Sequence, residues 1–431
     1  MIGVSHELEK GSDSQAVYLN LKNNEALWAL MDQGVVSGGN FLTTLVLVRS
    51  LTQVDFGTYS LVFLVLLSLN TLHSSLVVYP LTVAVAQTSG TAGREALGRC
   101  IVHTCVLWVP WLSILLVVLL ILHRPEILVT VGLALLCWQL QEVARRALLA
   151  DANAKNAIIP DLVSYAGQAL ILITLHLQSL NAIFLSIGLT SLAALLWQLA
   201  IARPLYRELT SRTHIGAAWK LGKFTLVANV LNMGILQFPS WTLDALQGRA
   251  VVGSYQALAN LIGIANPILF SMSNMLIPAV ARAAGDGLAA VRKIMVKNAV
   301  LFSSLLLPCF LLMGLFPRQI MSVVYGTHSP YLPLAPLLRI LAFTFLLSFL
   351  ATLIGAYEGG LSRPKTYMFA QIASLSVLVT TGLVLIKLYG IAGALYAGAL
   401  AAAARMLTFI VLSRRADRAI MMSEAETVDA P

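Results

Sequence analysis

Two arginines lie inside long apolar segments of this chain, where a positive charge is costly. Arg339 lies about eight residues from one end of its apolar segment, and Arg405 lies at a similar distance from one end of its own, which in a helix is a depth of roughly 12 Å. A guanidinium group forms paired hydrogen bonds with phosphate oxygens. We therefore predict that these two arginines bind a phosphate group of the substrate.

Side-chain amides are concentrated in two neighbouring apolar segments, and a few more lie in the first. An amide both donates and accepts hydrogen bonds, which suits sugar hydroxyl groups without requiring a cation. The candidate substrate-binding amides are Asn40, Asn229, Asn232, Gln237, Gln256 and Asn260. Hydrogen bonding between helices explains any single one of them equally well.

Two residues of opposite charge occupy similar places before a repeated Gly-x-Tyr motif. Arg49 precedes Gly57 by eight positions, and Asp244 precedes Gly253 by nine. We predict that Arg49 and Asp244 form an outer gate. The alternative is that Arg49 only anchors its helix among lipid headgroups.

Sequence signatures of the common enzymes and metal sites are absent from the chain. It contains no Gly-x-x-x-x-Gly-Lys-Ser/Thr, His-Glu-x-x-His or Cys-x-x-Cys pattern. The largest predicted outer loop, Pro317–Tyr331, contains no acidic residue that could hold a metal or act as a base. We therefore expect no enzyme activity, no metal and no cofactor.

The elements that must position these residues are membrane helices. The chain is 58% hydrophobic and 11% charged, whereas soluble proteins carry about 25% charged residues, and about 20 apolar residues span a bilayer as a helix. The fold class is therefore an all-α polytopic membrane protein with about 12 transmembrane helices. The predicted helices are Ala26–Ser50, Thr58–Gln87, Cys100–Leu122, Ile127–Leu149, Ile158–Leu177, Asn181–Ala202, Phe224–Leu246, Val251–Ala281, Ala299–Phe316, Leu332–Tyr357, Tyr367–Ile386 and Ile391–Leu412.

Positive charges predict the orientation of these helices. If both termini are cytosolic, 21 of the 28 Lys and Arg residues fall on the inner side, 5 fall on the outer side and 2 lie within spans. This asymmetry is the one that membrane insertion follows. The net charge of +9 thus reflects topology and contact with membrane lipids, and it does not predict nucleic-acid binding.

A short motif returns halfway along the chain and indicates an internal duplication. Phe56-Gly57-Thr58-Tyr59 is matched by Val252-Gly253-Ser254-Tyr255. Six helices in each half predict two pseudo-symmetric bundles around a central cavity, related by an axis along the membrane normal. The predicted domains are a cytosolic segment 1–25, an N-lobe 26–202, a cytosolic linker 203–223, a C-lobe 224–413 and a cytosolic tail 414–431.

Three stretches resemble polysaccharide flippases of the Wzx type. Leu45–Leu51 with Phe56–Leu61 resembles their junction between helices one and two. Val252–Tyr255 with Leu276–Arg282 resembles their region of helices seven and eight, and Leu388–Ala394 is similar to their last outer turn. These flippases belong to the multidrug/oligosaccharidyl-lipid/polysaccharide (MOP) exporter superfamily.

The resemblance implies a V-shaped pair of six-helix bundles that works by alternating access in a bacterial inner membrane. The cargo would be an oligosaccharide on undecaprenyl pyrophosphate, flipped from the inner to the outer leaflet for exopolysaccharide, O-antigen or capsule export. Relatives use cationic cavity residues and ion gradients. Candidate partners are therefore the lipid-linked oligosaccharide, H⁺ or Na⁺ as a coupling ion, and a glycan polymerase complex.

Three other functions remain open. A cation-coupled multidrug exporter of the same superfamily requires membrane-buried acids, and Asp244 and Asp32 are the only candidates near the predicted interlobe axis. A glycan polymerase or ligase is disfavoured by the short outer loops. A scaffold without transport activity is disfavoured by the arginines within spans.

Overall fold

The computed structural model describes residues 28, 31–87, 91–151, 155–206, 212–263 and 265–428. The predicted cytosolic segment 1–25 lies outside these residues. All regular structure in the described chain is helical. A first helix covers 31–50. It is followed by α2 (Gln53–His73), α3 (Tyr79–Gln87), α4 (Thr91–Ile121), α5 (Leu128–Ala150), α6 (Lys155–Asp161), α7 (Gly167–Leu175), α8 (Leu180–Ala202), α9 (Arg212–Gln247), α10 (Arg249–Gly263), α11 (Asn266–Ala283), α12 (Leu288–Leu315), α13 (Pro317–Tyr325), α14 (Leu337–Gly360) and α15 (Pro364–Val428).

Eight stretches of the described chain are long and apolar enough to cross a membrane, which makes this an all-helical polytopic membrane protein. The last of these stretches, in α15, contains two helices. They are divided at Gly390, whose φ of 59° and ψ of −127° are not helical. Glycine adopts positive φ without a steric penalty, so the division falls between the two predicted helices Tyr367–Ile386 and Ile391–Leu412.

One predicted helix, Val251–Ala281, is two helices in the structure. α10 ends at Gly263, and α11 begins at Asn266 with Pro267 in its first turn. Proline is tolerated at a helix start because its missing N–H has no partner to lose there. The hydrophobic pattern runs through the break, so it could not reveal the division.

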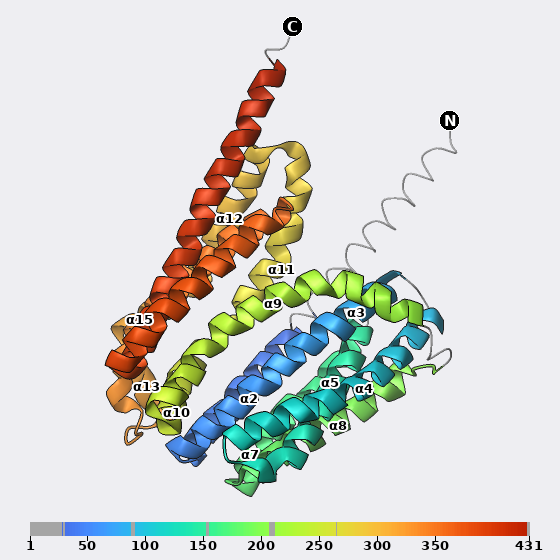
Figure 1. Cartoon of the computed structure of the whole chain (residues 1–431), viewed down its shortest axis with the longest axis vertical. Coiled ribbons are helices and arrows are strands. Elements are labelled where there is room, and N and C mark those ends of the chain that lie inside the picture. Colours follow the sequence, from blue (N-terminus) through green and yellow to red (C-terminus); the bar gives the residue numbers. More distant parts are fainter. Residues whose placement is uncertain are drawn as a thin grey trace, which may run out of the picture. The chain divides into compact units, whose positions relative to one another are not determined.

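Contacts between residues divide the chain into two units. Unit 1 comprises 1–43 and 69–226, and unit 2 comprises 44–68 and 227–431. In unit 1, helices α4, α5 and α8 lie side by side (Figure 1). Apolar side chains of α3, α4 and α5, among them Leu81, Leu97 and Val143, form one of its buried cores.

The core of unit 2 lies between α11, α12 and α14. Met272, Phe302, Leu306 and Phe349 are buried there in one cluster. Within the same unit, the repeated glycines Gly57 of α2 and Gly253 of α10 lie against each other.

The contact between these two glycines is reciprocal. A Cβ atom built on Gly57 would lie 1.9 Å from the carbonyl oxygen of Arg249, and one built on Gly253 would lie 2.4 Å from that of Gln53. Each contacted carbonyl belongs to the residue four positions before the partner glycine. Such reciprocity is what a local twofold relation between the two motifs requires, and glycine permits the close approach of the helices.

Candidate functional site

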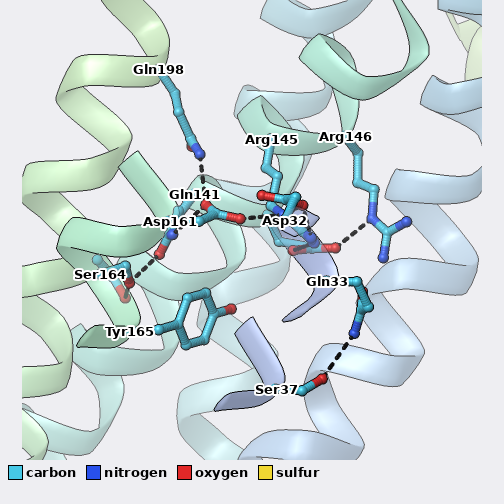
Figure 2. Close-up of polar contacts among 12 residues, drawn as sticks. Asp32, Gln33, Ser37, Gln141, Arg145, Arg146, Asp161, Ser164, Tyr165 and Gln198 are labelled. Atoms are coloured by element: carbon cyan, nitrogen blue, oxygen red, sulfur yellow. Dashed lines mark hydrogen bonds and ion pairs between the residues drawn. The ribbon is translucent and has the colours of Figure 1, made fainter. Parts of the chain in front are cut away.

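Unit 1 contains a buried cluster of charged side chains, shown in Figure 2. Arg145 of α5 lies between Asp32 of the first helix and Asp161 at the end of α6. The side chains of both aspartates are 0% exposed, and that of Arg145 is 4% exposed. Arg145 Nη1 also donates to Glu142 (3.2 Å), and Glu142 accepts a second bond from Arg146 Nε (2.5 Å).

Local sequence explains how these groups meet. Glu142, Arg145 and Arg146 are spaced i, i+3 and i+4, which places them together on one face of α5. Pro160 lies one residue before Asp161 and cannot donate a helical hydrogen bond. A π-helical turn, 162–166, follows directly, and such turns redirect side chains at functional sites.

Amide and hydroxyl groups hold Asp161 from its other side. Gln141 Nε2 and Gln198 Nε2 both donate to Asp161 Oδ1, at 3.3 and 3.1 Å. Ser164 Oγ in turn donates to Gln141 Oε1 (2.9 Å), which fixes the orientation of that amide. Asp161 is therefore bound by a neutral donor from α5 and one from α8 as well as by the guanidinium of Arg145.

The cluster contains more acidic groups than basic groups. When all groups are ionised, three carboxylates (Asp32, Glu142 and Asp161) face two guanidinium groups (Arg145 and Arg146). Oδ1 of Asp32 has no hydrogen-bond partner among the described residues, and Oδ2 of Asp161 contacts Arg145 without the geometry of a hydrogen bond. A buried uncompensated charge is unfavourable, so the cluster can take up one positive charge.

This cluster bears on two predictions from the sequence. The pattern of positive charges predicts that Arg145 lies in an inner loop, but its side chain is buried between acids. The sequence offers Asp244 and Asp32 as the only acids near the predicted interlobe axis, and the structure adds two further acids within unit 1: Asp161, which is buried, and Glu142, whose side chain is 12% exposed. Scarcity of buried acids therefore does not argue against a cation-coupled exporter.

Arg405, in the second half of α15, has no carboxylate partner among the described residues. Its Nη2 atom lies 3.5 Å from the carbonyl oxygen of Ser348 in α14, and its Nε atom is buried without a hydrogen bond. No acidic residue occurs between Asp286 and Glu358 of the sequence, so α14 from Leu337 to Tyr357 cannot supply one. Within the part of the chain that the structure describes, no carboxylate compensates the positive charge of this arginine, which lies in a candidate span.

Arg339 does not lie at the predicted depth. Residues 332–334 form a separate 3₁₀ turn, and α14 begins only at Leu337, so Arg339 lies in the first turn of its helix. Its side chain is exposed, and its Nε atom donates to the carbonyl oxygen of Gly314 (3.1 Å). The estimate of depth is wrong because the apolar pattern continues through residues that precede the helix.

Gln237 lines a recess of about 380 Å³ in unit 2, together with Phe238, Trp241 and Leu375. Its amide donates to the carbonyl oxygen of Leu64 (3.1 Å) and to the hydroxyl of Ser68, and it accepts from Trp241 Nε1 (3.3 Å). Both N–H groups of this amide are used in these bonds, so its oxygen, with one lone pair left, is the part that can accept a bond from a ligand in the recess.

The remaining candidate amides are spread over several helices. Gln256 Nε2 donates to Ser240 Oγ (2.8 Å) and so joins α10 to α9. Asn260 Nδ2 is buried and has no hydrogen-bond partner among the residues that the structure describes. Asn40, Asn229 and Asn232 are partly buried on the first helix and on α9. No common cavity for the six amides is described within either unit, and their role in substrate binding stays a prediction.

The structure does not pair Arg49 with Asp244. Arg49 Nε donates to the carbonyl oxygen of Val324 (2.8 Å), near the end of α13. Asp244 lies 4.0 Å from Arg249. A cation at the end of a helix satisfies its last carbonyl groups. In this structure Arg49 does so for α13. The gate formed by Arg49 and Asp244 stays a prediction.

Comparisons with known proteins identify the fold. No family model matches the sequence, and no curated protein matches it. The fold is similar to an inward-facing multidrug resistance MATE family transporter of the MOP superfamily, with a TM-score of 0.73 and 14% identity over 92% of this chain and 96% of that one. It is also similar to the lipid II flippase MurJ in an inward closed conformation, with a TM-score of 0.71 and 10% identity over 94% and 93% of the two chains.

A third similar structure is a MOP superfamily transporter from Pyrococcus furiosus, described as having a binding pocket of reverse polarity. Its TM-score is 0.64, with 15% identity over 92% of this chain and 96% of that one. At these identities the likeness establishes the fold alone. The chain thus has the fold of these MOP-superfamily transporters.

Proposed function

We propose that this protein flips an oligosaccharide linked to a polyprenyl diphosphate from the inner to the outer leaflet of a bacterial inner membrane, with both termini in the cytosol. The proposal rests chiefly on Arg405. An uncompensated guanidinium within a span favours an anionic cargo over a cationic drug. The recess at Gln237 and Trp241 offers a surface for sugar. The predicted lobes, 26–202 and 224–413, would alternate in access to the two leaflets.

We propose further that a proton drives this transport at the cluster of Asp32, Glu142, Arg145, Arg146 and Asp161, which we call the unit 1 charge cluster. One positive charge would balance it. Among the described residues, no group of three His, Cys, Asp or Glu side chains could hold a metal ion. The guanidinium of Arg145 already lies against both aspartates, which leaves room for a proton rather than for a hydrated cation.

A cation-coupled multidrug exporter is the second candidate, favoured by the same excess of one buried carboxylate. The two candidates differ in cargo. The flippase must transfer a diphosphate lipid and depend on Arg405, whereas the exporter must release a cationic dye and does not require Arg405. Both depend on the acids of the unit 1 charge cluster.

Replacement of Arg405 is expected to stop transfer of the lipid. In liposomes that contain the purified full-length protein and a short fluorescent glycan on undecaprenyl diphosphate, we expect Arg405→Ala to lower the rate of transfer between leaflets at least about tenfold. The reason is the loss of a charge-assisted hydrogen bond to phosphate, worth about 1.5–3 kcal/mol. Arg405→Lys, which keeps the charge, should be intermediate.

The matched control is Arg414→Ala, an exposed arginine on the same helix, which should transfer lipid at the wild-type rate. Equal rates for Arg405→Ala and Arg414→Ala would refute the role of Arg405. A wild-type protein that transfers no lipid but releases a cationic dye along a proton gradient would replace the flippase by the exporter.

Replacement of Asp161 is expected to uncouple transport from protons without unfolding the protein. Asp161→Asn leaves two carboxylates against two guanidinium groups, so the cluster becomes balanced. We expect its transfer rate not to respond to an imposed pH gradient, whereas wild type should respond. Asp151→Asn, an exposed acid just after α5, is the control and should respond as wild type does. A preserved response in Asp161→Asn would place coupling elsewhere.

A further inference from the structure

A second, smaller recess lies in unit 2 beside the start of α13 and the start of α14. It has a volume of about 350 Å³, and its lining includes two arginines, Arg318 and Arg339, with Pro317, Pro333 and Pro336. Arg339 Nε is held by the carbonyl oxygen of Gly314, so the other nitrogens of that guanidinium remain for a ligand. This volume is large enough for a phosphate or a diphosphate group.

The recess contains no acid to balance its two arginines. The sequence from 287 to 357 contains no Asp or Glu, and α12, α13 and most of α14 lie within that range. No carboxylate pairs with Arg318 or Arg339 among the described residues. Two like charges that line one small recess repel each other, and an anion between them removes that repulsion.

Other arginines at the predicted outer ends of the helices have partners of their own. Arg49 donates to the carbonyl oxygen of Val324. Arg124 lies 3.5 Å from Glu126, and Arg249 lies 4.0 Å from Asp244. Positive charge on the outer side opposes the usual topology of membrane proteins. Among the described residues, Arg318 and Arg339 form no ion pair with a carboxylate, unlike Arg124 and Arg249, so they require a different explanation.

The position of the recess along the helices indicates which kind of ligand can reach it. α12 ends its span at Leu315, and α14 begins its span at Leu337. Arg318 and Arg339 lie within three residues of those two ends, where the apolar helices stop and where we expect lipid headgroups. Lipids supply phosphate groups at that level.

We propose that the recess formed by Arg318 and Arg339 binds the phosphate of a membrane lipid at the outer surface. Two lipids present this chemistry: a phospholipid, through its phosphodiester, and a polyprenyl carrier, through its diphosphate. The diphosphate offers more oxygens to two guanidinium groups. The site does not depend on the proposed transport, because binding of either lipid satisfies the same charges.

Native mass spectrometry of the purified full-length protein tests the site. The probes are undecaprenyl diphosphate, phosphatidylglycerol and, as a lipid without phosphate, diacylglycerol. We expect wild type to bind at least one phosphate lipid about tenfold more tightly than diacylglycerol. The variant Arg318→Gln/Arg339→Gln should lose at least tenfold in that affinity, and Arg124→Gln should lose none.

Two results would overturn the proposal. One is a double variant that melts at the wild-type temperature and binds phosphate lipid within twofold of the wild-type affinity. The other is wild-type protein that binds diacylglycerol as tightly as the phosphate lipids. In competition, displacement of phosphatidylglycerol by undecaprenyl diphosphate would assign the site to the carrier lipid. The opposite preference would assign it to a phospholipid. A failure of lipid transfer in liposomes would leave these binding results unchanged.

Discussion

Arg145→Leu should cause the largest loss of stability of any single replacement in unit 1. The variant leaves Asp32 and Asp161 buried without their guanidinium partner, and Glu142 loses one of its two arginines. Removing one partner of a buried ion pair costs about 3–5 kcal/mol, because the remaining charge stays in a medium of low polarity. We expect a much lower melting temperature in detergent and little protein in the membrane.

Arg146→Leu is the matched control for this replacement. Arg146 is the next residue of α5 and also binds Glu142, but its side chain is 44% exposed. A surface ion pair contributes at most about 1 kcal/mol, so we expect a melting temperature close to wild type. The double variant Arg145→Leu/Asp32→Leu should recover part of the loss, since it removes an acid with the arginine. Equal stability of Arg145→Leu and Arg146→Leu would contradict the ion-pair arrangement.

Gly57→Ala should be strongly destabilising in unit 2 although it adds a single methyl group. The new Cβ would lie 1.9 Å from the carbonyl oxygen of Arg249, so α2 and α10 would have to separate. Elsewhere in a helix, alanine is favoured over glycine by about 1 kcal/mol. Overpacking of this kind costs about 1–3 kcal/mol or more, and the contacted atom is backbone, which cannot move away as a side chain would.

Gly398→Ala provides the comparison within the same unit. A Cβ there would lie 3.7 Å from a methyl group of Thr344, which is an ordinary contact. We expect its thermal stability to equal or exceed that of wild type. Gly253→Ala should resemble Gly57→Ala, because the contact is reciprocal. If Gly57→Ala melts as Gly398→Ala does, the close crossing of the two helices is wrong.

Part of the unit 1 charge cluster could have been found in the sequence. Glu142, Arg145 and Arg146 fall inside the predicted span Ile127–Leu149, and Asp161 falls inside Ile158–Leu177. Charge counting for topology assigned the two arginines to an inner loop, although their spacing places them with Glu142 on one helix face. The partner Asp32 is more than a hundred positions away, and no local pattern relates it to Arg145.

The sequence alone determined that this is a helical membrane protein, because apolar length and the lack of charge suffice for that conclusion. It also singled out Gly57 and Gly253, since a repeat is a property of sequence. Tertiary structure alone decided that these glycines contact each other and that Arg145 lies between two aspartates. It also placed Arg339 at a helix end beside Arg318. Each of these facts depends on which helix faces lie together, and the apolar pattern of a membrane helix does not specify which of its faces meets a neighbour.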